Sequence, residues 1–181
     1  MFEQIGRTWG GLDFLLHSIA FAPKEDLHRR IVDCSAEGFA MAMDISCHSF
    51  IRMARLAEPL MTGGGCLLTV DVLRRREGGV GLQPDGPGEG GAGKLGALHG
   101  AQLGEKRIRV HALSPGPLKT RAASGIDRFD ELLDRARLQA PEHQLATIED
   151  VGALAAFLVS DAAAALTGNV EYVDAGFHIV A

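Results

Sequence analysis

The stretch LDFLLHSI, residues 12–19, is a short apolar run that directly follows Gly10 and Gly11. Almost continuous hydrophobicity over so few residues is typical of a strand that is buried on both faces of a parallel sheet. Two similar runs follow, CLLTV at residues 66–70 and RIRVHAL at residues 107–113. Residues 12–19 therefore predict the first buried strand of a parallel sheet.

The segments between and after these runs predict helices and a last strand. Residues 37–61 carry apolar side chains on more than one helical face, which predicts a helix that packs on the sheet and on a second body. Thr147 followed by Asp150 resembles a capping box at the start of a helix. The last run, NVEYVDAGF at residues 169–177, alternates as a strand does. Strands that alternate with helices predict an α/β fold with right-handed crossovers.

The composition favours one globular unit without a nucleic-acid or membrane partner. A chain of 181 residues, 46% of them hydrophobic, can bury a core. Its net charge of -5 argues against binding to nucleic acid or to an anionic membrane, and no apolar run is long enough to cross a bilayer. Three cysteines without a C-x-x-C pair predict reduced thiols in the cytoplasm. The adjacent Cys47 and His48 lack further ligands at metal-site spacing, so we predict no metal site.

One segment interrupts the alternation of strands and helices. A crossover must join the parallel strands 66–70 and 107–113, and it is usually helical. Eleven of the 23 glycines nevertheless lie between Gly78 and Gly104. Glycine costs about 1 kcal/mol at a helix-interior position, so a long helix is not expected there. We predict that residues 71–102 form an irregular or disordered glycine-rich insert.

Part of this insert, GEGGAGK at residues 88–94, fits most of the phosphate-binding pattern G-x-x-x-x-G-K. That pattern needs Ser or Thr after the lysine to hold Mg²⁺, and it needs a strand directly before the loop. Leu95 stands at the first position, and QPDGP precedes the loop. We therefore do not predict a phosphate-binding loop here.

The flanking segments are specific enough to indicate a family. They resemble the NADH-dependent enoyl-[acyl-carrier-protein] reductases of bacterial fatty acid synthesis, which belong to the short-chain dehydrogenase/reductase superfamily. The segments that carry the resemblance are GLDFLLHSIAFAPKEDL (11–27), SPGPLKTRAASGI (114–126), TIEDVGALAAFLVSD (147–161) and TGNVEYVDAGFHI (167–179). The sequence departs from the usual Gly-Gly of the superfamily at Ala175. The resemblance implies a Rossmann-like doubly wound parallel sheet, of which residues 1–181 form only the C-terminal part as a single incomplete domain.

The resemblance also implies which residues would bind NADH. The backbone of Ser18 and Ile19 would pass beside the adenosine ribose and the nicotinamide. The backbone of Leu118 would pair with the nicotinamide carboxamide, and the Thr120 hydroxyl would reach the pyrophosphate, with Lys119 between them on the cofactor side.

On the substrate side, the resemblance implies that Ala22 and Phe129 would lie beside the acyl group of an enoyl-acyl carrier protein. It further implies a cytoplasmic homotetramer, built in part through the helix over residues 37–61. The expected activity of the family is NADH-dependent reduction of the trans-2 double bond.

Two parts of the family pattern are missing from this sequence. It begins beyond the β-α-β region whose glycine-rich turn takes the cofactor pyrophosphate. It also lacks the Tyr-x6-Lys pair whose tyrosine hydroxyl polarises the thioester carbonyl. Leu82 stands where this tyrosine is expected and Glu89 where the lysine is expected, while the one tyrosine of the chain is Tyr172. We therefore predict no catalytic residue in this chain.

A shift of the reading frame explains the insert. Read one base out of frame, residues 71–79 can back-translate to TYYGAEKVV and residues 82–89 to YNLMGPVK. The second string is a Tyr-x6-Lys pair at the place where the family has it. We interpret residues 71–100 as a miscoded catalytic segment.

The missing parts have consequences for stability and leave alternatives open. A sheet ordered 3-2-1-4-5-6 would lose strands 3, 2 and 1, which would expose the edge and face of a central strand. We therefore expect a marginally stable, aggregation-prone polypeptide. Two alternatives remain: a non-catalytic partner of an intact reductase, supported by the apolar helix at 37–61, and a reductase of the superfamily that uses other residues.

Overall fold

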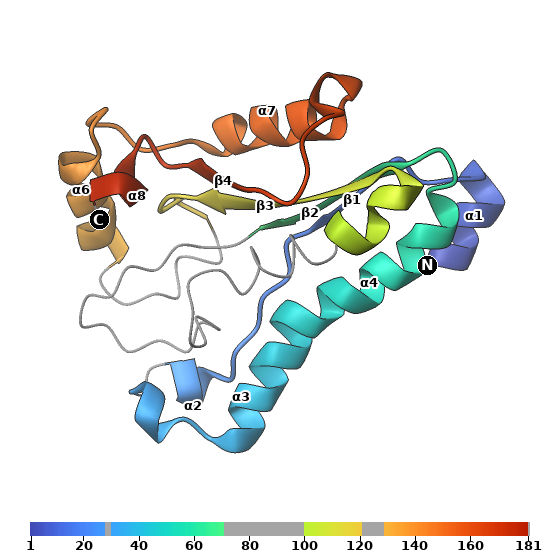
Figure 1. The fold of residues 1–181 in the computed structure, drawn as a ribbon. Helices are drawn as coiled ribbons and strands as arrows, with labels where there is room; N and C mark the ends of the chain where they lie inside the picture. Colours follow the sequence, from blue (N-terminus) through green and yellow to red (C-terminus); the bar gives the residue numbers. More distant parts are fainter. Residues whose placement is uncertain (28–29, 71–99, 121–128, 181) are drawn as a thin grey trace.

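The computed structural model of the chain describes residues 1–27, 30–70, 100–120 and 129–180. Its sheet has four strands in the order β1-β2-β3-β4, and every neighbouring pair is parallel (Figure 1). The strands are β1 (Phe14–His17), β2 (Gly65–Val70), β3 (Ile108–Pro115) and β4 (Val170–Val173). The predicted α/β fold with a parallel sheet is confirmed.

Helices precede, connect and follow these strands. The α-helices are α1 (Phe2–Trp9), α2 (Lys24–Leu27), α3 (Ala36–Met43), α4 (Ser49–Ala57), α6 (Phe129–Gln139), α7 (Ile148–Val159) and α8 (Phe177–Val180). A π-helical turn spans Asp44–His48, and 3-10 turns span Ile31–Asp33, Glu58–Leu60, Gly104–Lys106 and Asp161–Ala163.

The glycine-rich insert lies almost entirely outside the described residues. Residues 71–99 are not described, and neither are the two positions expected for the catalytic pair, Leu82 and Glu89. Residues 100–103 are helical, so the predicted irregular range 71–102 extends too far at its C-terminal end.

Two helical layers enclose the central strands β2 and β3. On one face, Phe50 and Ala54 of α4 pack with Leu67 and Val110. On the other face, Leu158 of α7 packs in a second cluster of buried residues, which also contains Cys66, Leu68, Leu113 and Ala163. In Figure 1 the two layers lie below and above the sheet. Burial on both faces is the physical reason why these strands are almost continuously apolar in sequence.

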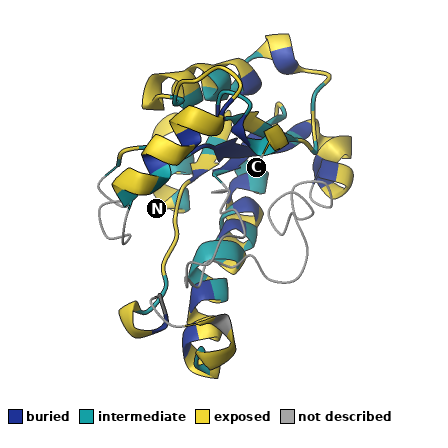
Figure 2. Ribbon diagram, turned by 90° about the vertical axis from the view of Figure 1, so that its left-hand side faces the viewer, coloured by how far each residue is buried: buried dark blue, intermediate teal, exposed yellow. Residues whose placement is uncertain are grey.

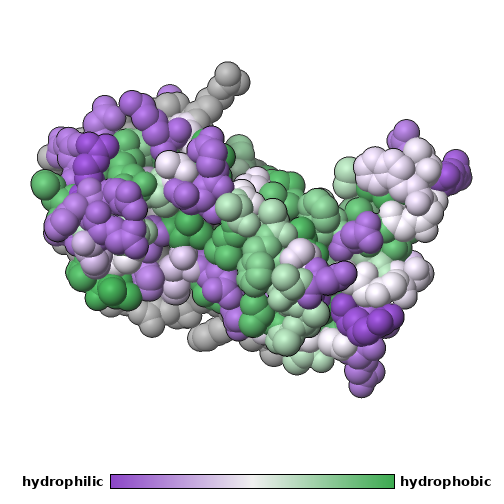
Figure 3. Space-filling view, turned by 90° about the horizontal axis from the view of Figure 1, so that it is seen from above, coloured by the Kyte–Doolittle hydropathy of each residue, from purple (hydrophilic) through white to green (hydrophobic). Residues whose placement is uncertain are grey.

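The predicted helix over residues 37–61 is confirmed as an uninterrupted helical run that comprises α3, the π turn, α4 and the 3-10 turn at Glu58–Leu60. Its burial is mixed along its length, as Figure 2 shows. Phe39, Met41 and Leu56 are exposed large hydrophobic residues on this run. Figure 3 shows apolar residues on the face that carries α7. Phe157 of this helix is an exposed large hydrophobic residue.

The prediction of a capping box at Thr147 is confirmed. The Thr147 side chain accepts a hydrogen bond from the Asp150 backbone at 3.1 Å, and the Asp150 carboxylate accepts one from the Thr147 backbone at 2.8 Å. The reciprocal pair satisfies two backbone N–H groups and fixes the first residue of α7.

Two predicted strands are shorter in the structure, and one of them is less buried. The run at 12–19 contributes only Phe14–His17, and its predicted burial on both faces is wrong because β1 lies at an edge of the described sheet. The run at 169–177 ends as a strand at Val173. Ala175 has a φ of 57° and Gly176 a φ of 82°, and these left-handed residues turn the chain into α8.

The conformation of Ala175 leads to a stability prediction. A left-handed conformation costs an L-residue about 1–2 kcal/mol. Glycine adopts this conformation freely, but it loses more conformational entropy than alanine when the chain folds. We expect Ala175→Gly to raise the free energy of unfolding by about 0.5–1 kcal/mol, measured by urea unfolding. Ala153→Gly, in the exposed interior of α7, is the control and should lower it by about 1 kcal/mol. A destabilising Ala175→Gly would contradict the prediction.

Candidate functional site

The two segments expected to bind the cofactor lie at the same edge of the sheet. Ser18 and Ile19 follow the end of β1, and Gly116 to Thr120 follow the end of β3. All strands are parallel, so the structure brings the two segments together at the carboxyl edge, with β2 between them. Ligands of open α/β sheets collect at this edge.

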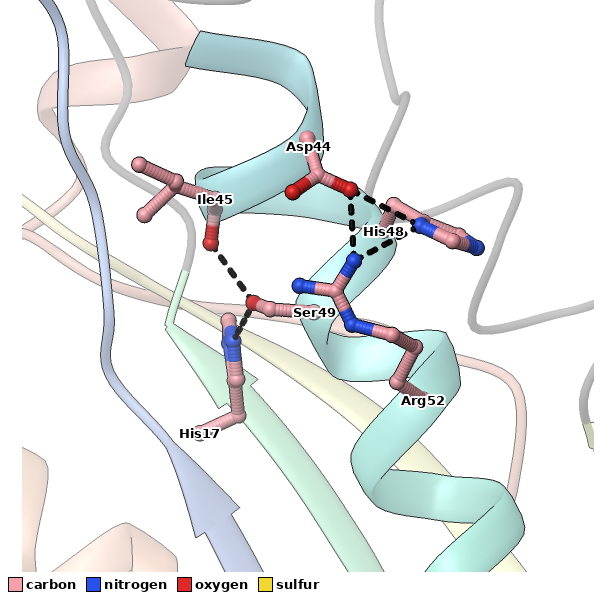
Figure 4. Close-up of polar contacts among 6 residues, drawn as sticks. All are labelled: His17, Asp44, Ile45, His48, Ser49 and Arg52. Carbon is pink, nitrogen blue, oxygen red and sulfur yellow. Dashed lines mark hydrogen bonds and ion pairs between the residues drawn. The ribbon is translucent and has the colours of Figure 1, made fainter. Parts of the chain in front are cut away.

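The segment after β1 is held by the helical run beneath the sheet. Buried His17 contacts Ser49, with 2.7 Å between Nε2 and Oγ, and Ser49 Oγ donates to the Ile45 carbonyl at 2.6 Å (Figure 4). Ser46 Oγ accepts from the Phe21 backbone N–H at 3.1 Å and donates to the Phe21 carbonyl at 3.2 Å. These contacts hold the two ends of the 17–21 segment against the first residue of α4 and against the π turn.

The hydrogen bonds of His17 indicate which ring nitrogen carries the proton. The single proton of Ser49 goes to Ile45, so Ser49 Oγ accepts from His17 Nε2–H. The other ring nitrogen, Nδ1, lies 3.5 Å from the Thr69 hydroxyl and is left as an acceptor. Burial lowers the pKa of His17, which keeps this neutral tautomer. His17 therefore donates to Ser49 and does not act as its base, so the pair lacks the polarity of a serine nucleophile.

Next to this contact, the π turn also carries an exposed ion cluster. The Asp44 carboxylate accepts from Arg52 and lies 3.0 Å from His48 Nδ1 (Figure 4). Arg52 and then His48 lower the pKa of Asp44. Because all three side chains are exposed, the cluster contributes little to stability. Among the described residues, no group of three His, Cys, Asp or Glu side chains could hold a metal ion.

The Ser46 contacts give a testable prediction about the backbone that would line the cofactor. Ser46→Ala removes both hydrogen bonds to Phe21, so we expect faster hydrogen exchange at the Phe21 amide and a loss of at most about 1 kcal/mol in unfolding free energy. Ser160→Ala is the matched control because it also removes one serine-to-carbonyl bond, to Phe157. Unchanged exchange at Phe21 in Ser46→Ala would show that Ser46 does not hold this segment.

The turn after β3 is packed against the turn after β4. The Gly116 N–H donates to the Val173 carbonyl at 3.0 Å, and a Cβ at Gly116 would lie 2.9 Å from the Asp174 Cβ. Asp174 is buried and accepts from the backbone N–H groups of Gly176 and His178. The absence of a side chain at Gly116 is therefore required by the protein's own packing.

A cavity of about 560 Å³ opens beside this turn. Leu118 and Lys119 line it together with Pro117, and α6 and the start of α7 form the other walls. Leu118 is half-buried and Lys119 is exposed, while Thr120 is half-buried. The cavity thus has mixed polar and apolar walls, and it lies beside the residues for which the resemblance implies contacts with the nicotinamide and pyrophosphate.

The two expected substrate residues come from different elements on the carboxyl side of the sheet. Ala22 lies between β1 and α2, and Phe129 is the first residue of α6 (Figure 1). Both are half-buried. The structure supplies two separate walls, with residues 121–128, next to Phe129, outside the described part of the chain.

Two side chains of the described sheet that could be reactive, Tyr172 and Cys66, are held by their surroundings. Tyr172, the one tyrosine of the sequence, lies on β4, and its ring stacks on His178 with 4.0 Å between ring centroids. Cys66 is buried on β2, and burial raises the pKa of its thiol to about 11, so it stays protonated.

Comparison with known proteins now gives the family. The family profile "Enoyl-(Acyl carrier protein) reductase" matches residues 1–178. The chain belongs to the enoyl-[acyl-carrier-protein] reductase family. It is 37% identical over 180 residues to "Enoyl-[acyl-carrier-protein] reductase [NADH] FabI" of Rickettsia felis, with 99% of this chain and 69% of that protein covered. A relative of the same name from Nostoc is 38% identical over 183 residues, again covering 99% and 69%.

Solved structures of reductases of this family share the fold. The Bacillus cereus enoyl-acyl carrier protein reductase, solved with NADP⁺ and an indole naphthyridinone, has a TM-score of 0.92 at 36% identity, covering 99% of this chain and 70% of that one. The Anaplasma phagocytophilum reductase, solved in complex with NAD, has a TM-score of 0.89 at 34% identity, covering 100% and 67%. The predicted Rossmann-like fold and the resemblance are therefore confirmed. No helix in the described part of the chain is long and apolar enough to cross a membrane.

Proposed function

We propose that this chain is a non-catalytic member of the enoyl-acyl carrier protein reductase family. The observation that carries the proposal is the position of Tyr172 on β4, stacked on His178. Since the sequence has no second tyrosine, it has no phenolic hydroxyl for the substrate carbonyl. We propose that residues 1–181 form a single incomplete Rossmann-like domain with walls of the cofactor and acyl sites.

The described residues fit only one end of NADH. The backbone of Ser18, Ile19 and Leu118 would hold the nicotinamide end, and Lys119 and Thr120 would reach toward the pyrophosphate. Among the described strand-to-helix connections, none has the G-x-G-x-x-G pattern that places a pyrophosphate on a helix N-terminus. We therefore propose weak NADH binding without hydride transfer.

On the acyl side, Ala22 and Phe129 support an enoyl-acyl carrier protein as the ligand. The three free cysteines support a cytoplasmic location, where thiols stay reduced. The exposed Phe39, Met41 and Leu56 on the long helical run support assembly with other copies, up to a tetramer.

The same exposed residues also favour a second candidate function, that of a structural partner of an intact reductase. In that case the chain would bind the intact enzyme through Phe39, Met41 and Leu56. Co-purification of the chain with an intact family member, lost in Met41→Lys, is the result expected for this alternative.

The proposal is tested by NADH consumption with a trans-2-enoyl thioester, together with NADH titration followed by fluorescence. We expect no consumption above that of a sample without protein, while the Rickettsia felis relative, which is named as an NADH enzyme, serves as the positive control in the same buffer. Turnover that depends on this chain would overturn the proposal. Sequencing the DNA across codons 70–103 separately tests the interpretation of residues 71–100 as miscoded.

A further inference from the structure

The helical run beneath the sheet contains the π turn at Asp44–His48. Such turns widen an α-helix by one residue and occur frequently at functional sites. This turn holds the segment after β1, because Ser46 makes two hydrogen bonds to the Phe21 backbone. The same turn also carries the exposed ion cluster drawn in Figure 4. A change in the cluster therefore acts on the turn that holds this segment.

The Nδ1 atom of His48 lies between two partners of opposite charge. It is 3.0 Å from Oδ1 of Asp44 and 3.1 Å from Nη1 of Arg52, which also donates to Asp44. An ionised carboxylate only accepts hydrogen bonds, and a guanidinium only donates them. Nδ1 can therefore bond to only one of the two. It accepts from Arg52 when it carries no proton, and it donates to Asp44 when it carries one.

The proton on the His48 ring thus determines what Arg52 contacts. A neutral ring with its proton on Nε2 lets the guanidinium bridge Asp44 and His48. A charged ring has a proton on both nitrogens, so it donates to Asp44 and faces Nη1 of Arg52 at 3.1 Å, where like charges repel. Histidine is the side chain whose charge ordinarily changes between about pH 5 and pH 8. The Arg52 bridge should therefore be made near neutral pH and lost in mild acid.

We propose that His48 is a proton-operated switch on the π turn. Its neutral ring retains the Arg52 bridge, and its protonation releases Arg52 and loosens the two hydrogen bonds between Ser46 and Phe21. The release has this effect because Ser46 lies between the two bridged residues in the turn. The held segment includes residues 18–19, so a falling pH would loosen backbone that is expected to line the cofactor.

Few other charges act on this ring. Among the described residues, Asp44 of the same turn and Arg52 of α4 are the charged groups in contact with it. The segment packed against the turn contributes one further titratable group, His17, which contacts Ser49. Burial lowers the pKa of His17, so its own titration has to be followed beside that of His48.

The test follows three NMR signals from about pH 8 to about pH 5, those of the His48 ring, the Arg52 Nε–H and the Phe21 amide. We expect the neutral ring to carry its proton on Nε2 and the three signals to change with one shared midpoint. The protection factor of the Phe21 amide, which corrects for the intrinsic pH dependence of hydrogen exchange, should fall about two- to fivefold. The change is limited because contacts between exposed charges are weak.

Two variants locate the effect. His48→Gln can still accept from Arg52 but does not titrate, and Arg52→Gln leaves the ring titrating with no bridge to release. Both should remove the response of the Phe21 amide. His143→Gln, at an exposed histidine in the turn after α6, is the matched control and should keep the response.

Three results would overturn the inference. These are a Phe21 response that survives in either variant, a response that follows the midpoint of His17 instead of that of His48, and a neutral His48 ring with its proton on Nδ1. All signals are measured on the full chain without cofactor. They are therefore independent of whether the chain turns over an enoyl thioester.

Discussion

Replacing Arg109 with methionine is expected to lower the free energy of unfolding by about 2–4 kcal/mol. The Arg109 guanidinium, on β3, donates to the Leu158 carbonyl and, at 3.2 Å, to the carbonyls of Val159, Ser160 and Ala163. Leu158 and Val159 end α7, so their carbonyls have no partner within the helix, while the Ser160 and Ala163 carbonyls also accept from the backbone N–H groups of Ala163 and Leu166. Hydrogen bonds from a charged donor are worth about 1.5–3 kcal/mol, and a cation at a helix C-terminus also interacts favourably with the helix dipole.

The experiment is urea unfolding followed by circular dichroism in sucrose, which strengthens burial and gives a folded baseline to a chain that we predict to be marginally stable. Methionine keeps an apolar stem, so the change isolates the guanidinium. Arg55→Met, at an exposed position of α4, should change the free energy of unfolding by less than about 0.5 kcal/mol. Arg109→Lys should be intermediate because an ammonium reaches fewer carbonyls. Equal effects at Arg109 and Arg55 would show that α7 does not depend on this contact.

The parts of the fold that the sequence predicts well are those determined by local chemistry. The capping box at Thr147 depends on two residues three positions apart. The apolar run at 66–70 predicts a strand that is covered on both faces, and this is read from the run itself. The end of β4 depends on local chemistry too, but the left-handed Ala175 has no sequence signal, since alanine rarely adopts that conformation.

The parts that sequence analysis missed depend on tertiary contacts. The π turn at Asp44–His48 lies where Ser46 and Ser49 contact the segment after β1, and helical periodicity does not reveal such contacts. His17 lies in the run LDFLLHSI, where a polar side chain directly after the apolar residues 14–16 was the available signal of a buried hydrogen bond. The roles of Leu118, Lys119 and Thr120 as cofactor ligands stay predictions, as do those of Ser18, Ile19, Ala22 and Phe129.

A second buried histidine, His111, gives the other large prediction. It lies on β3 between Arg109 and Leu113, on the face toward α7, and is 0% exposed. Neither ring nitrogen has a partner among the described residues at full hydrogen-bond geometry, and the Leu166 backbone interacts with the ring only weakly, as the last and smallest influence on its pKa. An unsatisfied buried polar group costs about 1–3 kcal/mol, so we expect His111→Leu to raise the free energy of unfolding by about that amount near pH 7.5.

The same histidine should make stability depend on pH. Burial lowers the pKa of His111, and Arg109 acts in the same direction, while Glu171 and the Leu166 backbone oppose them. The folded pKa lies below the unfolded value of about 6.5, so the unfolded chain binds more protons between the two values. Stability is therefore complete above about pH 6.5 and is lost as the pH falls toward the folded pKa. His17, whose pKa burial also lowers, acts in the same window.

Urea unfolding at about pH 7.5 and pH 5.5 separates the two effects of His111. His111→Leu should be more stable than the wild type and lose less stability on acidification, with the remaining loss due to His17. His111→Gln keeps a polar side chain but does not titrate. It should therefore also lose less unfolding free energy on acidification than the wild type, but it should not show the gain in unfolding free energy at pH 7.5. A glutamine variant with the wild-type loss would show that the protonation of His111 does not determine the acid sensitivity. A leucine variant without the gain would show that its ring nitrogens are satisfied in solution.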